Sequence, residues 1–476
     1  MRRAMSDSLP QVRLHNSLTR HTEPLQTLEA GRVGIYTCGS TVYKYAHIGN
    51  LRTYLFGDLL HRTLEYLGYD VRYVKNITDV GHMRDDQLDS LAGPDKVELA
   101  AETEGKSPME IADFYTAAWL EDEAALNILP ADVMPRATDH IPEMLSMTAQ
   151  LIEKGLAYEV DGTIYYDVSE FAGYGRLSGQ QIDKMRAGHR VEVEGDKRDP
   201  ADFALWKHAR EHRLMQWPSP WGDGFPGWHI ECSAMALKHL GERFDIHTGG
   251  IDLKFPHHED EIAQSEGALG HPVVSIWMHG EFLTMDDAKM AKSTGNIIRV
   301  ADLPSLGHEP LAFRYLALTA HYRSKLDFTT DALHAASSGL ARLRRAAAGP
   351  DDPVDLSAEP VARYRARFAG AMADDLASPK ALAAAHEVAS ASDLTDAQRR
   401  ALLLDFDRVL GLNLGVTPTS ETPLPAGAAE LLERRGAARA SRDWAASDTL
   451  RDDLAALGVN VRDTPTGQEV TGRREG

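Results

Sequence analysis

The sequence predicts an α/β protein in which a parallel sheet is followed by a helical region and a small terminal module. Three observations carry this prediction. A strand, a helix and a second strand follow one another early in the chain, the order that produces parallel strands. Alanine-rich amphipathic stretches begin after about residue 310. A segment rich in Pro, Thr and Gly at 413–427 then sets off the terminal module from the rest.

The first three elements form a βαβ unit. Val33 and Ile35 alternate with smaller or polar residues and predict a strand that ends near Cys38. Leucines at helical spacing predict a helix over Gly49–Tyr69, and Val71–Val74 has the composition of a second strand. Parallel strands joined in this way leave a ligand crevice at their carboxyl ends. We therefore expect a binding site where the first strand passes into its helix.

The middle of the chain looks like an insertion into this fold. Glu98–Ala125 is acidic and predicts a helical run. Beyond it, Ala157–Val160 and Thr163–Asp167 predict two short strands on either side of Gly162. The segment Val273–Trp277 predicts a further strand.

The region after about residue 310 is predicted to be mostly helical. Amphipathic stretches cover 331–349, 358–373, 380–391 and 397–411. Asp374-Asp375 and Ser378-Pro379 mark a break between two of these helices. A helical bundle is unspecific: it could bind RNA or form a subunit interface.

Composition is that of an ordinary globular protein. The chain has 476 residues, 43% hydrophobic and 26% charged, and this length predicts more than one domain. The first residues lack the apolar stretch of a signal peptide, and no run of 18 apolar residues occurs. A cytoplasmic location is therefore expected, with no membrane partner. Two cysteines form no disulfide framework, so the thiols are available as metal ligands.

Net charge argues weakly against a nucleic-acid partner. At −20 the chain lacks the basic field that is typical of proteins that neutralise phosphates. Local basic strips, Arg342-Leu343-Arg344-Arg345 and Arg434-Arg435, could still contact a nucleic-acid backbone. The alternative is that each strip is simply a solvated helix face.

The first motif with chemical content is His47-Ile48-Gly49-Asn50, at the predicted start of the first helix. Backbone N–H groups at a helix N-terminus favour phosphate, so this position suits a nucleotide. By itself the pattern is weak, because a turn with an ordinary polar helix cap has the same residues.

The second motif is Lys289-Met290-Ala291-Lys292-Ser293. Two lysines three residues apart on a loop can both reach a triphosphate, and their charge matters most while pyrophosphate leaves. A solvated lysine loop is the alternative for an isolated pair of this kind.

Residues that commonly bind metals lie between the two motifs. His257 and Glu261 are four residues apart, so both can face one side of a helix that begins at Pro256. Together with Cys38 and Cys232 they offer thiolate, imidazole and carboxylate, which are all zinc ligands. Further candidates, which spacing does not exclude, are His229, His258 and Glu259. Alternatively, the two cysteines are small buried hydrophobic residues.

Taken together, these motifs resemble those of the class I aminoacyl-tRNA synthetases, and within them the cysteinyl-tRNA synthetase family. The likeness runs nearly end to end, from Arg32 to Asp448. It implies a Rossmann-like nucleotide-binding sheet with an inserted connective domain, a helical bundle and a small anticodon-binding module. The domains implied are 1–126 (first catalytic half), 127–225 (connective insertion), 226–310 (second catalytic half), 311–412 (helical bundle), 413–427 (linker) and 428–476 (anticodon-binding module).

The resemblance also implies residue roles. The catalytic residues would be His47, Asn50, Lys289 and Lys292. ATP would be bound by His47, Gly49, Asn50 and Lys292. Cysteine would be bound by Gly39, Thr41, Thr78 and Trp228. One zinc ion would be held by Cys38, Cys232, His257 and Glu261. tRNA would contact Trp444, which can stack on a splayed base. The chain departs from the family pattern at Asn50, where many members have His, and at Ala291, where Ser is usual.

The implied function is a two-step cysteine–tRNA ligase that uses ATP with Mg²⁺. Cysteine and ATP would give cysteinyl-adenylate and pyrophosphate, and the 3′-terminal adenosine of tRNA(Cys) would then take the cysteine. Zinc would select cysteine over serine because it binds a thiolate far better than a hydroxyl. Two alternatives remain: a cysteine-adenylating ligase with an amino-sugar acceptor, like mycothiol ligase, and a non-catalytic tRNA- or zinc-binding protein. A monomer is favoured.

Overall fold

A four-stranded parallel sheet organises the larger part of the chain. Its strands are β3 (Arg32–Thr41), β4 (Asp70–Thr78), β9 (Phe244–Gly250) and β10 (Val274–Gly280), in the spatial order β10-β9-β3-β4. After β3 the chain adds β4 on one side, and β9 and β10 then follow on the other side. The strand order therefore reverses between β3 and β9. The predicted α/β class with a parallel sheet is confirmed. In such sheets ligands bind at the carboxyl ends of the strands where the order reverses.

The computed structural model describes residues 10–81, 95–180, 197–209, 213–285, 288–289, 297–416, 427–457, 459–464 and 467–473. Two compact units are present, residues 1–416 and residues 417–476. Within the described residues, no helix is long and apolar enough to cross a membrane.

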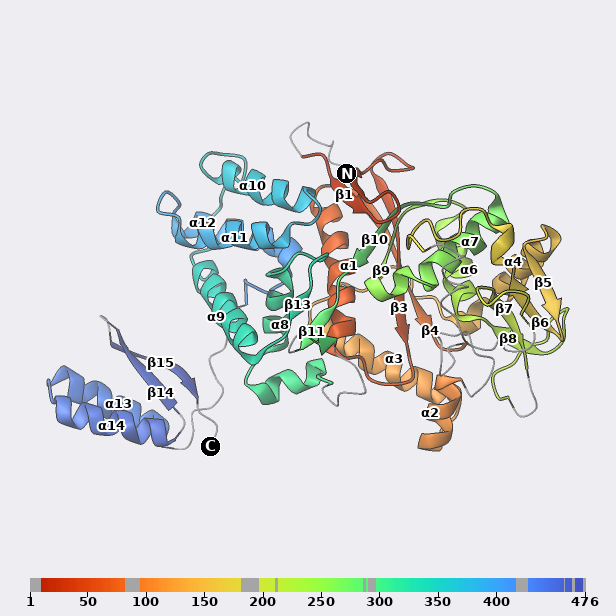
Figure 1. The fold of residues 1–476 in the computed structure, drawn as a ribbon. Coiled ribbons are helices and arrows are strands. Elements are labelled where there is room, and N and C mark those ends of the chain that lie inside the picture. The colour runs from red at the N-terminus through yellow and green to blue at the C-terminus, as the bar shows by residue number, and fades with distance from the viewer. Residues whose placement is uncertain are drawn as a thin grey trace. The chain divides into compact units, whose positions relative to one another are not determined.

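Alternation along β3 decides which residues face which helices. Ile35 belongs to the core cluster that contains helix α1 (Ile48–Tyr66), whereas Tyr36 and Cys38 belong to a second cluster. Helix α6 (Trp228–Leu240) contributes to this second cluster, and α7 (His257–Leu269) lies beside α6 (Figure 1). Because successive side chains of a strand point to opposite faces, Cys38 lies on the side of the sheet that α6 and α7 cover.

The acidic run after β4 is two helices rather than the single helical run expected over Glu98–Ala125. They are α2 (Lys96–Glu104) and α3 (Pro108–Ala125). Gly105 ends the first with φ 65°, and Ser107 caps the second just before Pro108. Left-handed glycine and a Ser-Pro start are ordinary stop and start signals, so the break was encoded locally.

The segment predicted to be an insertion contains a four-stranded antiparallel sheet in the order β5-β6-β7-β8. Both predicted strands are present, as β5 (Ala157–Val160) and β6 (Thr163–Tyr166). Asp161 and Gly162 join them with φ values of 49° and 79°. A two-residue hairpin loop with both φ values positive suits the twist of the flanking strands. The other members of the insertion are η2 (Ala137–His140), α4 (Ile141–Glu153), η3 (Val168–Glu170), β7 (Phe203–His208) and β8 (Gly224–Pro226).

The helical region agrees with the sequence pattern to within a few residues. Its helices are α8 (Pro310–Leu318), α9 (Thr330–Ala347), α10 (Val361–Ala373), α11 (Ser378–Ser390) and α12 (Asp396–Leu410). Arg344 was expected either to contact a nucleic-acid backbone or to lie on a solvated helix face, and both expectations were wrong. Its side chain is buried and pairs with Glu309 and the Leu412 carbonyl. It is therefore neither solvated nor available to a nucleic acid.

The second unit is a pair of helices and a hairpin. Its elements are α13 (Ala428–Ala440), α14 (Trp444–Ala456), β14 (Val459–Thr464) and β15 (Gly467–Arg473). Arg435 is buried there and donates to Asp463 and Gln468 at 2.7 Å each, so it too is structural. The remaining elements of the chain are β1 (Arg13–Asn16), β2 (His21–Pro24), η4 (Ile251–Lys254), β11 (Leu283–Met285), β12 (Ala288–Lys289), η6 (Val300–Leu306) and β13 (Leu326–Asp327).

Candidate active site and metal centre

A cavity of about 240 Å³ lies at the carboxyl ends of β3 and β9, beside the start of α1. This is the edge where the strand order reverses. Of the predicted site residues, Cys38, Gly39, Thr41, Asn50 and Trp228 line it. Asp252 in η4 is the one carboxylate among the described lining residues, and the sequence pattern had not singled it out.

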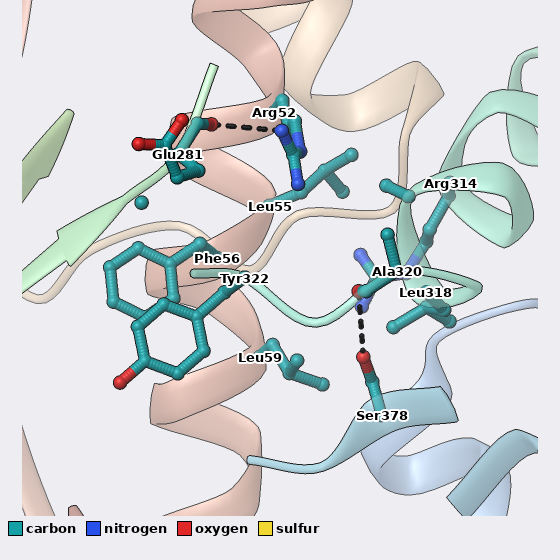
Figure 2. A pocket seen from close by; sticks show the side chains of 12 residues that line it. Arg52, Leu55, Phe56, Leu59, Glu281, Arg314, Leu318, Ala320, Tyr322 and Ser378 are labelled. Carbon is teal, nitrogen blue, oxygen red and sulfur yellow. Dashed lines mark hydrogen bonds between the residues drawn. The ribbon is translucent and has the colours of Figure 1, made fainter. Parts of the chain in front are cut away.

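A second hollow, between α1, α8 and α11, is of a different kind (Figure 2). It measures about 30 Å³, room for roughly one water molecule. The rings of Phe56 and Tyr322 stack at its side with centroids 4.4 Å apart. None of the predicted site residues that the structure describes lines it, so we regard it as a packing defect rather than a substrate site.

The structure brings together the four predicted metal ligands, which come from three elements. Cys38 lies near the carboxyl end of β3, Cys232 lies in α6, and His257 and Glu261 occupy successive turns of α7. The two Sγ atoms are 3.7 Å apart, and Glu261 Oε1 lies 3.5 Å from Cys38 Sγ and 3.2 Å from His257 Nε2. All four side chains are buried. One ion at the centre of these atoms could bind all four.

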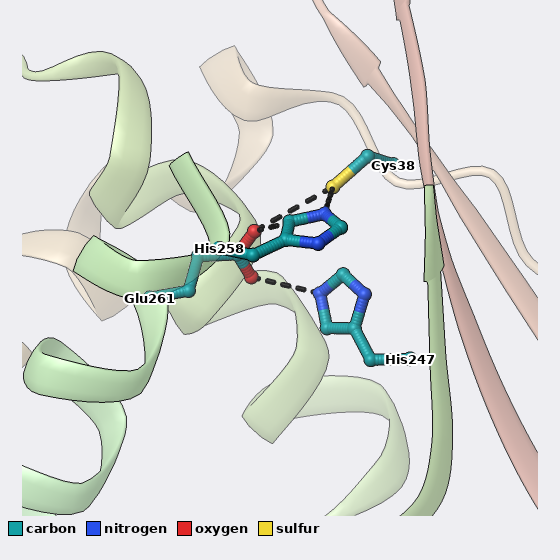
Figure 3. A group of neighbouring side chains, drawn as sticks. All are labelled: Cys38, His247, His258 and Glu261. Carbon is teal, nitrogen blue, oxygen red and sulfur yellow. Dashed lines mark hydrogen bonds and ion pairs between the residues drawn. The ribbon is translucent and has the colours of Figure 1, made fainter. Parts of the chain in front are cut away.

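Two further histidines adjoin this cluster (Figure 3). His247 Nε2 lies 2.9 Å from Glu261 Oε2, and His258 Nε2 lies 3.4 Å from Cys38 Sγ. The set Cys38, His247, His258 and Glu261 has its ligand atoms as close together as the predicted set. His258 had been named as a competitor, whereas His247 was missed. Its one signal was an imidazole in the middle of a buried strand, a residue type that such strands seldom contain.

The other two competitors have different partners. Both carboxylate oxygens of Glu259 accept from backbone N–H groups, of Leu177 at 3.3 Å and of Ser178 at 2.7 Å. His229 lies between His257 and Asp260, with contacts of 2.8 Å and 3.2 Å. Such an outer partner fixes the orientation of a ligand imidazole, so His229 leaves His257 Nε2 facing the cluster.

The electrostatics of the cluster keep its two thiols neutral unless a cation is bound. Burial raises the pKa of the Cys38 thiol, and the neighbouring Cys232 and Glu261 raise that pKa further. Burial likewise raises the pKa of Cys232. Without a positive charge nearby, both thiols are protonated at neutral pH. A divalent ion reverses this preference because it stabilises thiolates directly, and the thiol, imidazole and carboxylate donors fit such an ion.

A backbone irregularity in β3 shapes the cavity wall. The pairing of β3 with β4 shifts register between Thr37 and Ser40. There the Gly39 N–H donates to Asn76 Oδ1 at 2.8 Å, and Asn76 Nδ2 donates to Thr78 Oγ1 at 3.1 Å. A Cβ on Gly39 would lie 1.7 Å from the Asn76 carbonyl oxygen, so only glycine fits. Thr78 is buried and does not line the cavity; Asn76, which links the two positions, was missed from the sequence.

Trp228 lines the cavity and contacts the metal cluster through His257. It is the first residue of α6, and its ring lies 4.5 Å from the His257 ring with 34° between the planes. Its indole is half-buried, with one side toward the cavity. The side chain therefore contacts both the cavity and a residue of the metal cluster.

The first motif forms the N-terminus of α1 as a reciprocal cap. His47 Nδ1 accepts from the Asn50 N–H, and Asn50 Oδ1 accepts from the His47 N–H, both at 3.2 Å. A Cβ on Gly49 would come within 2.9 Å of His47 Nδ1. The helix-cap interpretation is thus confirmed, while contact with ATP stays a prediction. Asn50 lines the cavity. The cap uses its side-chain oxygen, and the amide N–H₂ group takes no part in the cap.

The second motif is only partly described. Lys289 ends strand β12, which pairs with β11, and nothing is described of its side chain. Lys292 and Ala291 lie outside the described residues. Trp444 belongs to the second unit, where it begins α14 with 57% of its surface exposed.

The chain is similar to known proteins over nearly its whole length. Residues 24–338 match the family described as tRNA synthetases class I (C) catalytic domain, and residues 421–470 match the Cysteinyl-tRNA ligase anticodon binding domain. Cysteine–tRNA ligase 1 of Burkholderia lata is 46% identical over 466 residues, 97% of each chain. Cysteine–tRNA ligase of Thermus thermophilus is 44% identical over 476 residues, 95% of this chain and 98% of its own.

Among solved structures, Mycobacterium tuberculosis methionyl-tRNA synthetase in complex with methionyl-adenylate is similar with a TM-score of 0.54. The match covers 87% of this chain and 96% of that one at 17% identity. At this identity the likeness concerns the fold alone.

Proposed function

Because the chain belongs to the family of class I cysteine–tRNA ligases, we propose that the cavity at the carboxyl ends of β3 and β9 joins cysteine to ATP. The products are cysteinyl-adenylate and pyrophosphate, and the 3′-terminal adenosine of tRNA(Cys) then takes the cysteine. The observation that carries this assignment is the buried cluster of Cys38, Cys232, His257 and Glu261, which opens to the cavity through Cys38.

The metal cluster serves recognition of the amino acid. Cys38, Cys232, His257 and Glu261 would hold one zinc ion, whose borderline-soft character binds the thiolate of cysteine and gains far less from the hydroxyl of serine. The protein's part is to place the substrate. Gly39 lets β4 come close to β3 because it carries no Cβ, which fixes the strand backbone at the cavity wall, and Trp228 lines the cavity as well. Thr41 offers a hydroxyl on the cavity wall. Thr78 does not line the cavity; it accepts a hydrogen bond from Asn76 and so holds the side chain that binds the Gly39 N–H.

ATP binds at the start of α1. The helix N-terminus favours phosphate through its N–H groups and its dipole, and the Asn50 amide offers a further donor at the cavity wall. His47 holds Asn50 in place through the reciprocal cap. Asp252 can accept hydrogen bonds from the ribose hydroxyls. Lys292 and Lys289, with the Mg²⁺ that accompanies ATP, would neutralise the leaving pyrophosphate.

The second unit is proposed to bind the anticodon. Trp444 is exposed at its surface, and aromatic side chains of this kind commonly stack on unpaired RNA bases. This reading agrees with the match of residues 421–470 to an anticodon-binding domain. We further propose a cytoplasmic monomer.

Aminoacylation of purified tRNA(Cys) tests the proposal. Cysteine should be attached only when ATP is present, and serine should be attached hardly at all. The metal content of the same preparation, measured by mass spectrometry, should be near one zinc per chain. Comparable charging with serine would rule out metal-based selection, and failure to charge any tRNA would overturn the assignment.

Truncation separates the tRNA ligase from a cysteine ligase with an amino-sugar acceptor. All proposed adenylation residues lie in residues 1–416, which form a compact unit by themselves. Deletion after Ala426 should leave cysteine-dependent pyrophosphate exchange intact and impair transfer to tRNA, because distant contacts position the acceptor end. Trp444→Ala should show a milder loss, about 1–3 kcal/mol for one stacked base. If the truncated chain charged tRNA as well as the intact chain, the anticodon role would be abandoned.

A further inference from the structure

Three aromatic side chains form an exposed strip beside the cavity. Tyr45 lies in the loop before α1, and Phe114 and Tyr115 lie on α3. Their rings meet edge to face, with centroids 6.0 Å apart for Tyr45 and Phe114, 5.2 Å for Tyr45 and Tyr115, and 5.1 Å for Phe114 and Tyr115. Tyr45 is 42% exposed and Phe114 is 45% exposed. We refer to Tyr45, Phe114 and Tyr115 as the aromatic strip.

A cation lies over each end of the aromatic strip. The guanidinium of Arg299 is 4.7 Å from the centre of the Tyr45 ring, and Lys106 Nζ is 4.7 Å from the centre of the Phe114 ring. Cation–ring contacts of this length are attractive. The three rings thus form one cluster with a cation over two of its members.

The strip begins at the mouth of the cavity. Tyr45 is one of the lining residues, whereas Phe114 and Tyr115 are not, so the rings lead outward from the site. The Arg299 segment is fixed to the same rim, because the Ile48 N–H at the start of α1 donates to the Ile298 carbonyl at 2.9 Å. A ligand that extends out of the cavity on this side would pass over the rings.

The rings are held in place although they are exposed. The Tyr115 hydroxyl donates to Glu104 at 2.7 Å, and the three rings restrain one another through edge contacts. Exposed apolar surface that adjoins a site usually marks a binding surface. Rigid aromatic faces bind at low entropic cost because few torsions remain to be frozen.

The charges on the strip favour bases over a phosphate backbone as the main contact. Each end cation has a carboxylate partner, Asp302 at 3.2 Å from Arg299 and Glu104 at 2.9 Å from Lys106. The strip is therefore close to neutral, which suits a duplex backbone poorly. Stacking needs no net charge, and aromatic platforms with flanking cations are typical of single-stranded nucleic-acid sites.

We propose that the aromatic strip stacks the unpaired bases at the 3′ end of tRNA and guides the terminal adenosine into the cavity. This inference rests on the proposed function, because the reaction requires the 3′ end to reach the adenylate. Phe114 and Tyr45 are the exposed rings of the strip, and Tyr115 braces them. The strip acts in transfer and has no part in adenylate formation.

Phe114→Ala tests the proposal without touching the cavity. Cysteine-dependent pyrophosphate exchange should be unchanged, whereas kcat/KM for tRNA in the transfer step should fall roughly 5- to 150-fold, the loss expected when one stacked base loses its platform. Phe114→Trp should restore transfer, since it restores a stacking face. Leu120→Ala is the matched control, because Leu120 is an exposed apolar residue on the same helix, 38% exposed and outside the strip.

A competitor without the 3′ end identifies what the strip binds. With the unaltered chain, tRNA(Cys) that lacks its unpaired 3′ nucleotides should inhibit charging less well than full-length, non-chargeable tRNA(Cys). In Phe114→Ala the two competitors should become similar. The proposal is overturned if Phe114→Ala leaves transfer unchanged, if Leu120→Ala impairs it equally, or if removal of the 3′ end affects both proteins alike. A protein with no pyrophosphate exchange at all would instead overturn the proposed function.

Discussion

Gly39→Ala should abolish most of the adenylation activity although the residue contributes no side-chain chemistry. An added Cβ would lie 1.7 Å from the Asn76 carbonyl oxygen, where Cβ contacts under 3.0 Å essentially never occur. The strand must therefore retreat by about 1 Å or more, and a misplacement of that size costs about 10²-fold in rate. The hydrogen bond from the Gly39 N–H to Asn76 Oδ1 would be lost as well.

The assay is cysteine-dependent exchange of pyrophosphate into ATP. Gly34→Ala is the matched control, because it lies in the same strand and its Cβ would meet Leu240 and Phe244 at an ordinary 3.5 Å. The control should keep its exchange rate, whereas Gly39→Ala should lose about two orders of magnitude. Thermal unfolding should show that both variants are folded. Equal exchange rates in the two variants would refute the steric argument and the place of Gly39 at the cysteine site.

Three further predictions concern the metal, the lysine loop and the core. Cys232→Ala or His257→Ala should strip most of the zinc and sharply weaken cysteine binding; full metal retention in both variants would contradict the ligand assignment. Lys292→Ala should slow pyrophosphate exchange by roughly 10²–10³, so an unchanged rate would remove its role. Lys75 is fully buried and touches both oxygens of Glu123, at 2.7 Å and 2.6 Å. Glu123→Gln should lower the free energy of unfolding by about 3–5 kcal/mol in urea titrations, and Lys75→Met in the same chain should restore part of it; a loss below about 1 kcal/mol would show that the ammonium finds another partner.

Local sequence patterns were enough to predict the strands and helices that carry the site residues. Alternation along β3 places Cys38 on one face of the sheet, and the four-residue spacing of His257 and Glu261 places both on one side of α7. The parallel order of β3 and β4 predicted where the cavity lies. These features depend on neighbours within a few residues, so the sequence determines them directly.

Local signals were also present where the prediction failed. The break between α2 and α3 follows from Gly105 and Ser107, which are stop and start signals that the acidic composition of the run obscured. Composition averages over a segment, whereas a helix end depends on single residues.

Other parts of the site depend on contacts that no local pattern contains. Cys38 and Cys232 are 194 residues apart, and their approach results from the packing of α6 on the sheet. Asn76 acquires its role from the register between β3 and β4, which sets it beside Gly39. His247 acquires its role from the packing of α7 beside β9, which sets Glu261 next to it. Without these contacts each residue is only a polar side chain in a buried strand.

Long-range contacts also explain why two arginines in basic runs are buried. Arg344 and Arg435 stand in basic runs that look solvated, yet each is buried against a carboxylate that folding brings from another element. The sequence by itself determined the strands, the helices and the residue types of the metal site. Tertiary structure decided which of those residues touch, because long-range packing, rather than spacing along the chain, selects the partners of a buried polar group.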